Sequence, residues 1–272
     1  MAPRRKKIPA AARRQQDLLT RNGEKVAAVY AKRLGRLREN ELRRVLRLSR
    51  DLDDPVAIAA LLETEIQEAY LGKWWQGLYA TAGVPAAAAS AAALGASAAA
   101  GETTLWTQAL RNYATQRAGS NISIVTGTWK TSLVKELRVI LAEATGVIKL
   151  PEGVKPPTYS VEAVARELFA RYQGDLKIWQ CRRIAQTECL IGMADAGDLA
   201  AKEVGIPYTK QWCTSGLSNV RESHAAVDGL VVDQDEPFEL PGGLLMYPHD
   251  TSLGADASEI INCACACIRQ PK

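Results

Sequence analysis

The sequence predicts an α+β protein: a mostly helical N-terminal two-thirds, followed by a small C-terminal strand-rich module packed on a long helix. Apolar residues recur at the spacing of a helix face along most of the chain as far as Val204. After Pro207 the pattern changes to short, β-prone runs that glycine, proline and aspartate separate. Helices followed by strands, rather than an alternation of the two, are typical of a segregated α+β architecture.

The first predicted helix covers residues 17–50 and is amphipathic and strongly basic. Its apolar face consists of Leu19, Val26, Tyr30, Leu34, Leu37, Leu42, Val45 and Leu46. Asp54 is a favourable N-cap for a second helix, and Pro55 suits its first position. The apolar stripe of this second helix consists of Ile58, Leu62, Ile66 and Tyr70. We expect the two stripes to pack against each other in the core or to form an oligomer seam.

Residues 83–101 are rich in alanine and contain no charged side chain. Alanine favours a helix, but this segment has no large apolar face with which to dock. It is either a helix packed closely against its neighbours or a mobile linker. We place a domain boundary at its end, so that a basic helical arm with the alanine-rich segment (1–101) precedes a second domain (102–272).

The second domain begins with further helices. Helical patterns cover residues 102–117 and 128–145, and the latter places on one face Trp129, Leu133, Leu137, Ile140 and Leu141. Proline and glycine then predict a loop, after which Ser160 caps a short helix. A longer helix is predicted over residues 176–204.

Three short strands are predicted after this helix, within residues 209–215, 229–233 and 259–268. Asp228-Gly229 predicts a tight turn between two strands, in which the glycine adopts a positive φ. In the last run three cysteines alternate with alanine, so they would share one face of a strand.

The net charge of +4 conceals an asymmetry along the chain. Residues 1–50 contain 16 Lys or Arg against four acidic residues, a charge of +12, which leaves −8 for the remainder. A basic arm on an acidic body predicts a polyanionic or acidic partner, although a well-solvated helix face has the same composition. The candidate nucleic-acid or partner-binding residues are Arg33, Arg36, Arg43, Arg44 and Arg47.

Composition excludes several classes of protein. With 47% hydrophobic and 24% charged residues the chain is typical of globular proteins. No run approaches the roughly 20 apolar residues that span a bilayer, and the basic N-terminus is not followed by the apolar core of a secretory signal. Six cysteines without framework spacing indicate a reducing cytoplasm.

Five motifs occur in a set order over residues 180–268: "RIAQTECLIGMADAG", "GIPYTKQWCTS", "VRESHAAVDGLVVDQDEPFEL", "YPHD" and "EIINCACA". Together they resemble the Mu F-like family of phage minor head, or head morphogenesis, proteins, with a family-like core at 177–268. The chain departs from the family pattern in three places. Gln186 and Ala264 stand where the family usually has arginine, and no aspartate precedes the Arg-x-x-His turn.

The resemblance implies a minor head protein domain over residues 102–272 and a low-copy structural component of the virion. Such a protein lies inside the capsid, associated with the portal, and aids procapsid assembly and DNA packaging or delivery; it is in the host cytoplasm during assembly. The expected partners are the portal protein, capsid or scaffolding proteins, and packaged DNA through the basic helix. The structural motif residues are Arg183, Thr187, Glu188, Trp212, Arg221, His224, Asp228, Gly229, Asn262, Cys263 and Cys265.

The charged motif residues suggest an ion pair. Glu188 projects from a predicted helix and could pair with Arg221, which would hold the Asp-Gly turn against that helix.

His224, Cys263 and Cys265 are the candidate metal ligands, because imidazole and thiolate are the groups that zinc prefers. Cys213 or His249 could complete a tetrahedron. However, C-x-C lacks the C-x-x-C spacing of a zinc knuckle, so a histidine hydrogen-bonded within a buried polar cluster is the favoured interpretation, with zinc as the alternative.

No catalytic residue is predicted. Cys263 and His224 have the types of a nucleophile and base, but their surroundings indicate a buried strand rather than an accessible thiolate. The sequence contains no glycine-rich phosphate loop, HExxH motif or paired carboxylate set. We therefore expect a structural protein without a required cofactor. Two alternatives stay open: a DNA-binding internal virion protein that holds, or is ejected with, the genome end, and a metal-dependent hydrolase.

Overall fold

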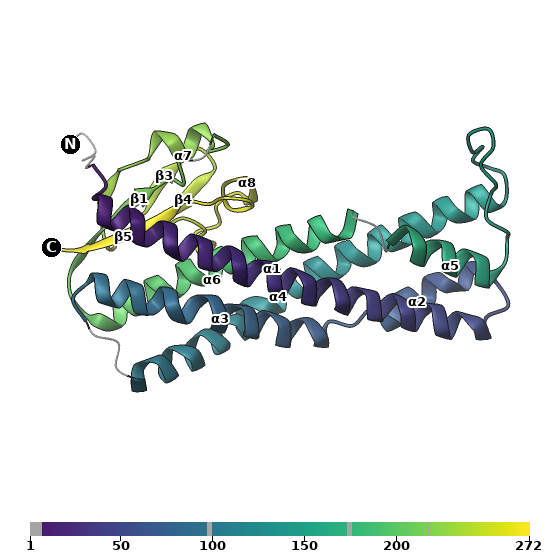
Figure 1. Ribbon diagram of the computed structural model, residues 1–272, viewed down its shortest axis with the longest axis horizontal. Helices are drawn as coiled ribbons and strands as arrows, with labels where there is room; N and C mark the ends of the chain where they lie inside the picture. The colour runs from purple at the N-terminus through teal and green to yellow at the C-terminus, as the bar shows by residue number, and fades with distance from the viewer. Residues whose placement is uncertain (1–6, 97–99, 173–175, 217) are drawn as a thin grey trace. The chain divides into compact units, whose positions relative to one another are not determined.

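A computed structural model describes residues 7–96, 100–172, 176–216 and 218–272. They form long helices and, near the C-terminus, a small module with antiparallel strands, which confirms the α+β class (Figure 1). The chain forms two compact units: a helical unit (residues 31–74 and 115–181) and a mixed unit (1–30, 75–114 and 182–272). Both units take residues from either side of position 101, because four helices contribute to both: α1 (Ala10–Leu48), α3 (Ala69–Ala93), α4 (Ala100–Ala144) and α6 (Leu176–Val204).

The helical unit begins with the end of α1, two 3-10 turns, η1 (Ser49–Asp51) and η2 (Pro55–Ala57), and α2 (Ile58–Glu65). Asp54 caps η2 as predicted: its Oδ1 accepts a hydrogen bond from Val56 N at 3.0 Å, and Pro55 stands at the first helical position. The helix α5 (Val161–Tyr172) is also capped as predicted, since Ala163 N donates to Ser160 Oγ at 3.2 Å.

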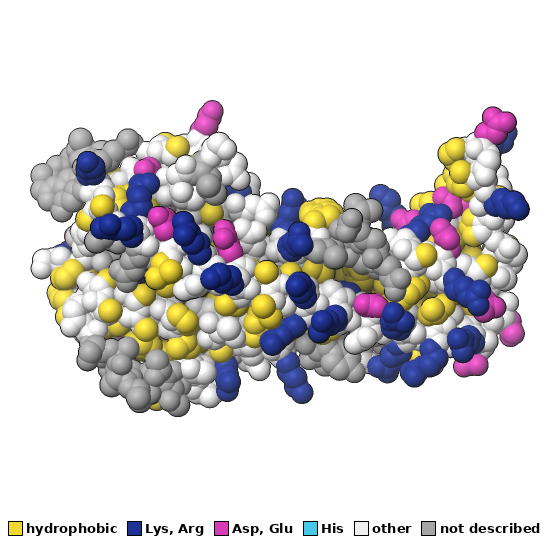
Figure 2. Space-filling view, in the orientation of Figure 1, with side chains coloured by type: hydrophobic (Ala, Val, Ile, Leu, Met, Phe, Trp, Pro, Cys, Tyr) yellow, Lys and Arg dark blue, Asp and Glu magenta, His cyan; other side chains and the backbone are white. Residues whose placement is uncertain are grey.

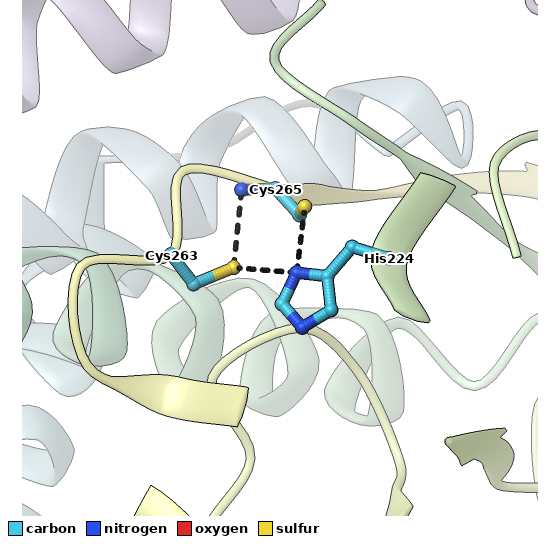
Figure 3. Close-up of side chains that lie close together, drawn as sticks. All are labelled: His224, Cys263 and Cys265. Carbon is cyan, nitrogen blue, oxygen red and sulfur yellow. Dashed lines mark hydrogen bonds between the residues drawn. The ribbon is translucent and has the colours of Figure 1, made fainter. Parts of the chain in front are cut away.

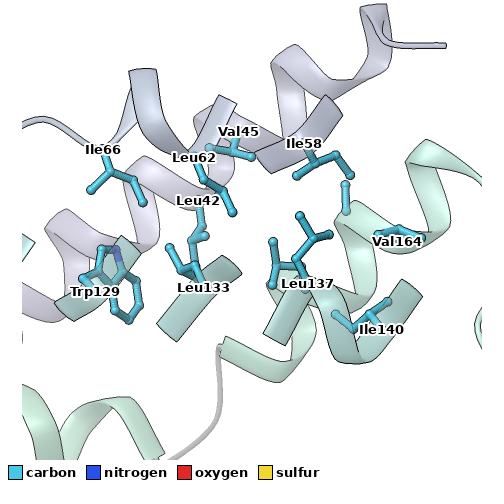
Figure 4. Packing of buried hydrophobic residues seen from close by; sticks show 12 residues of the cluster. Leu42, Val45, Ile58, Leu62, Ile66, Trp129, Leu133, Leu137, Ile140 and Val164 are labelled. Carbon is cyan, nitrogen blue, oxygen red and sulfur yellow. The ribbon is translucent and has the colours of Figure 1, made fainter. Parts of the chain in front are cut away.

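The predicted apolar stripes meet in one core (Figure 4). Residues of α1, α2, α4 and α5 form this cluster, and its members include Leu42, Val45, Ile58, Leu62, Ile66, Trp129, Leu133, Leu137, Ile140 and Val164. The expectation that the first two helices pair through their stripes is confirmed in this unit. The Tyr70 side chain lies outside the described residues.

The alanine-rich segment is helical as far as Ala93, because it continues α3 without a break. An ideal Cβ on Gly83 would lie 3.1 Å from Ala196 Cβ and 3.2 Å from the Gly192 carbonyl oxygen of α6. The small residues therefore let two helix backbones approach closely, and the linker interpretation is wrong for residues 83–93. Residues 97–99 lie outside the described part.

Three predicted helix boundaries are wrong. The second predicted helix, with a stripe that reaches Tyr70, ends at Glu65 because the backbone is extended at Ile66, and Tyr70 lies on α3. The helices expected at 102–117 and 128–145 are one helix, α4, since glycine and serine each lower helix stability by less than about 1 kcal/mol and do not break a helix. The first helix starts at Ala10 rather than at residue 17, because alanine, arginine and glutamine favour the helix. The helix α6 has the predicted bounds and ends before Gly205, whose φ is +70°.

Two small sheets form the C-terminal module. The strand β1 (Tyr208–Cys213) lies between β2 (Val231–Asp233) and β5 (Ala266–Pro271), antiparallel to both. The strands β3 (Phe238–Leu240) and β4 (Gly243–Leu245) form a hairpin. Two short helices, α7 (Glu222–Ala226) and α8 (Ala257–Ile260), complete the module.

The last predicted strand is wrong in position. Residues 257–260 are helical and Asn262 has a φ of +57°, so the chain turns before it pairs with β1. Cys263 and Cys265 therefore lie in the segment that connects α8 to β5, and only Cys267 is on the strand, opposite Trp212. Among the described residues, no helix is both long and apolar enough to cross a membrane.

Candidate functional site

A buried cluster of one imidazole and two thiols lies in the C-terminal module (Figure 3). His224 extends from α7 toward the segment that precedes β5, where Cys263 and Cys265 point back at it. Their sulfurs lie 3.5 Å and 3.3 Å from the same atom, His224 Nδ1. The three side chains are 1%, 3% and 5% exposed. The predicted proximity of these residues is confirmed, although a turn rather than a strand produces it.

Glu259 holds the other nitrogen of the imidazole. His224 Nε2 lies 2.8 Å from Glu259 Oε2, which also accepts a hydrogen bond from Ser223 Oγ at 3.0 Å. The second carboxylate oxygen accepts from Gly242 N at 3.2 Å. A carboxylate that accepts three bonds assigns the proton to Nε2 and leaves Nδ1 as a bare lone pair facing the sulfurs.

The surroundings of the sulfurs favour one thiolate. The pKa of Cys263 lies well below its ordinary value, chiefly because the Cys265 thiol hydrogen-bonds to it, and the nearby His249 adds to the effect. The pKa of Cys265 is raised for the complementary reason and by burial. The backbone N–H of Cys265 also donates to Cys263 Sγ at 3.3 Å. Two adjacent thiols thus share one proton within a set of hydrogen-bond donors.

Aromatic side chains form one wall of the cluster. The Trp212 ring lies edge-on to His224 at 5.3 Å and to Phe238 at 5.2 Å between centroids. Its indole Nε1 is buried without a well-formed hydrogen bond, and its interaction with Cys265 offsets a small part of the rise in the pKa of that thiol. Trp212 is one of the predicted motif residues, and its fully buried side chain covers this side of the cluster.

His249 is the second histidine near the sulfurs. Its φ of +73° is unusual for a residue with a side chain, and its Nε2 lies 3.1 Å from the Cys265 carbonyl oxygen. Burial disfavours its charged form, but the interaction with Cys263 outweighs burial and raises the pKa of His249. Its Nδ1 is buried without a well-formed hydrogen bond. Cys213, the other predicted fourth ligand, instead hydrogen-bonds the Thr214 carbonyl, and burial raises its pKa to about 11.

The remaining motif residues support the segments that carry the cluster. Asp228 Oδ1 accepts from Thr214 N at 2.8 Å, and Gly229 has the predicted positive φ of +75°. This turn joins α7 to β2 rather than two strands. Thr187 Oγ1 of α6 accepts a hydrogen bond from Asn262 N at 3.5 Å, which ties the turn before Cys263 to the long helix.

The predicted pairing of Glu188 with Arg221 is replaced by other partners. Glu188 Oε2 accepts hydrogen bonds from Trp75 Nε1 at 2.8 Å and from Tyr79 OH at 3.0 Å. Arg221 donates to the Ile261 carbonyl oxygen. The prediction failed because α3, more than 100 residues earlier in the chain, packs against α6 and supplies the donors. Arg183 is exposed on α6.

The predicted basic residues lie on the part of α1 that belongs to the helical unit. Arg33, Arg36, Arg43 and Arg47 are exposed, and dark-blue Lys and Arg side chains follow the visible face of α1 in Figure 2. Arg43 pairs with Glu39 at 2.6 Å and stacks over Phe169. Arg44 pairs with Glu65 at 2.5 Å. Arg43 and Arg44 are therefore engaged in ion pairs within the unit.

The sequence analysis did not identify Glu259 as a functional residue. The one feature that could have indicated it is a carboxylate shortly before the cysteines. Nor did it identify Lys210, which is fully buried 5.9 Å from the Phe238 ring centroid, with a pKa lowered by burial. Neither role follows from spacing, because both depend on which elements meet.

Comparisons with known proteins give two partial similarities. The chain is 33% identical over 90 residues to an uncharacterized protein, YqbB, of Bacillus subtilis (strain 168), a match that covers 32% of this chain and 29% of that protein. It is 35% identical over 94 residues to the NAD(+)--arginine ADP-ribosyltransferase EFV of Enterococcus faecalis (strain ATCC 700802 / V583), a match that covers 33% of this chain and 18% of that protein. The chain thus matches less than a third of each relative. No family model matches it, and no solved structure does.

Proposed function

We propose that the chain is a phage minor head, or head morphogenesis, protein that works as a structural adaptor beside the portal. The observation that carries the proposal is that residues from motifs that follow one another along the sequence lie close together in the structure. Trp212, His224, Cys263 and Cys265 pack together, while Asp228 and Gly229 form the turn that follows α7. A motif set that encodes a packed module, rather than an open pocket, supports a role in assembly.

The adaptor mechanism assigns different tasks to the two units. The mixed unit contains the motif module, which is held by buried polar contacts and presents a rigid surface. The helical unit carries the exposed arginines of α1, which suit an acidic protein surface or DNA. We place the protein in the capsid interior, in few copies, with the portal and capsid or scaffolding proteins as partners.

Procapsid composition tests this proposal. Procapsids would be assembled with and without the portal protein, purified, and probed for this chain. We expect retention with the portal and loss without it. Equal incorporation in both preparations would contradict the portal-adaptor function.

A second candidate is an internal virion protein that holds the genome end, and the exposed arginines favour it. Neutralising Arg33, Arg36 and Arg47 to glutamine should then abolish retention on DNA–cellulose, and wild-type retention should fall steeply with salt, since phosphate contacts release counterions. The matched control neutralises Lys135, Arg138 and Lys149, which are exposed in the same unit and carry the same charge. Equal loss in both variants would indicate a net-charge effect and contradict a specific DNA face.

We do not propose the metal-dependent hydrolase. A catalytic zinc ion needs an open position that substrate can reach, whereas His224 is 1% exposed beneath Trp212. A hydrolytic activity that disappears in a His224→Ala variant would reverse this conclusion.

A further inference from the structure

Two sulfurs converge on one nitrogen atom in the C-terminal module. A neutral imidazole nitrogen has a single in-plane lone pair, so it can accept one good hydrogen bond. Yet Cys263 Sγ and Cys265 Sγ both lie within 3.5 Å of His224 Nδ1. A hydrogen bond to Nδ1 therefore explains one of the two short sulfur–nitrogen distances and leaves the other unexplained.

The distances match the edges of a metal tetrahedron. With Zn–S near 2.3 Å and Zn–N near 2.05 Å at a tetrahedral angle, a sulfur and a nitrogen ligand lie about 3.5 Å apart. The observed separations are 3.5 Å and 3.3 Å. All three ligand atoms lie within 4.8 Å of one another, and His224, Cys263 and Cys265 are the one such group among the described residues.

The His224 ring has, on its far side, the hydrogen-bond partner that a metal-bound histidine requires. A ligating imidazole almost always donates its other N–H to a carboxylate or a carbonyl, which fixes the tautomer. Glu259 accepts from His224 Nε2 at 2.8 Å and is itself held by Ser223 and Gly242. The Cys265 N–H that points at Cys263 Sγ stabilises a thiolate in the same way.

We propose that His224 Nδ1, Cys263 Sγ and Cys265 Sγ bind one zinc ion that joins α7 to the segment before β5. Two thiolates and an imidazole are a soft donor set that selects zinc over magnesium or calcium. Burial of all three ligands assigns the ion a structural role. The proposed zinc site does not depend on which partner the protein has, so this proposal does not rest on the proposed function.

His249, which the sequence offered as a fourth ligand, is not in this group: among the described residues, no set that contains it has all its ligand atoms within 4.8 Å of one another. We therefore assign three protein ligands to the ion.

The metal content of the purified protein tests the site. Elemental mass spectrometry of wild-type protein should find about one zinc ion per chain, as for a closed structural site. The Cys263→Ser/Cys265→Ser variant should lose it, while Cys267→Ser should retain it, because Cys267 is a nearby thiol that lies on β5, outside the cluster. Zinc that stays in the double variant would overturn the proposal.

Cobalt substitution tests the same site in wild-type protein and so does not depend on a variant that folds. Co²⁺ added to the metal-free wild-type chain should produce thiolate-to-cobalt charge transfer and the visible bands of a tetrahedral ion. Absence of these bands, together with absence of zinc in the purified protein, would overturn the proposal. Glu259→Gln should weaken zinc binding about 10- to 100-fold.

Discussion

The core of the helical unit and the cluster around His224 are both buried, but the first is stabilised by apolar packing and the second by hydrogen bonds between polar side chains. The helical core joins apolar stripes whose spacing repeats along each helix, so its members can be found one helix at a time. The His224 cluster joins single polar residues from α7, α8 and the segment before β5. Burial of apolar area tolerates small shifts, whereas a buried polar group must meet its partner within hydrogen-bond distance. The first region is therefore readable from periodicity, and the second depends on the tertiary fold.

The largest effect is expected in the helical core. Leu133→Ala removes a fully buried side chain and should lower the free energy of unfolding by about 2–5 kcal/mol, through lost burial and the cavity left behind. Chemical denaturation measures it. Val56→Ala, at a side chain 53% exposed in the same unit, should stay within about 0.5 kcal/mol of wild type. Similar effects of both substitutions would contradict the core described for this unit.

The polar cluster should respond to loss of a single charge. Glu259→Gln keeps the shape of the side chain but replaces one accepting oxygen by an NH₂ group, which would face one of the three present donors. The free energy of unfolding should fall by about 1–3 kcal/mol. Nitrogen-15 NMR of the histidines would show whether the proton of His224 leaves Nε2. Glu239→Gln, on an exposed side chain of β3, is the control. An unchanged tautomer and stability would remove Glu259 from its positioning role.

Substitution of two helical glycines by alanine distinguishes the contribution of helix propensity to stability from that of packing. Gly83→Ala should destabilise the protein by about 1–3 kcal/mol, because the new methyl group meets Ala196 and the Gly192 backbone. Gly35→Ala, with nothing within 4 Å of the new atom, should stabilise α1 by about 0.5–1 kcal/mol. Thermal unfolding of both variants measures the two signs. A gain at both positions would mean that α3 and α6 do not pack as closely as described.

The smallest effect is expected at Lys210, where a buried ammonium has no well-formed hydrogen bond. Lys210→Met should leave stability unchanged or raise it by about 1 kcal/mol, since a hydrophobic residue avoids burying an unpaired charge. Burial lowers the pKa of Lys210, so the unfolded chain binds the proton more tightly. Wild-type stability should therefore rise relative to the variant as the pH approaches the ordinary lysine pKa of 10.5.

The measurement is denaturant unfolding of both proteins at several alkaline pH values. A gap that widens with pH, or a variant that loses several kcal/mol, would mean that Lys210 has a partner that stabilises its charge.

Local sequence signals predicted much of the fold. Asp54 with Pro55, Ser160 and Gly205 placed helix ends correctly, because each acts through neighbours a few residues away. The sequence also predicted that His224, Cys263 and Cys265 would be buried together, which the distances confirm. It placed Cys263 and Cys265 on a strand because the cysteines alternate with alanine at the period of a strand, whereas the strand begins only at Ala266.

By itself, the sequence determined the helical stripes, the caps, the basic face of α1 and the residue types of the C-terminal motif, since these depend on period, local hydrogen bonds and composition. Only the tertiary structure decided that Glu188 is bonded to Trp75 and Tyr79, that Glu259 orients His224, and that two sulfurs meet at one nitrogen. Such contacts join residues far apart in the chain. A hydrogen bond or a ligand set depends on where atoms arrive, and spacing along one element carries no record of that.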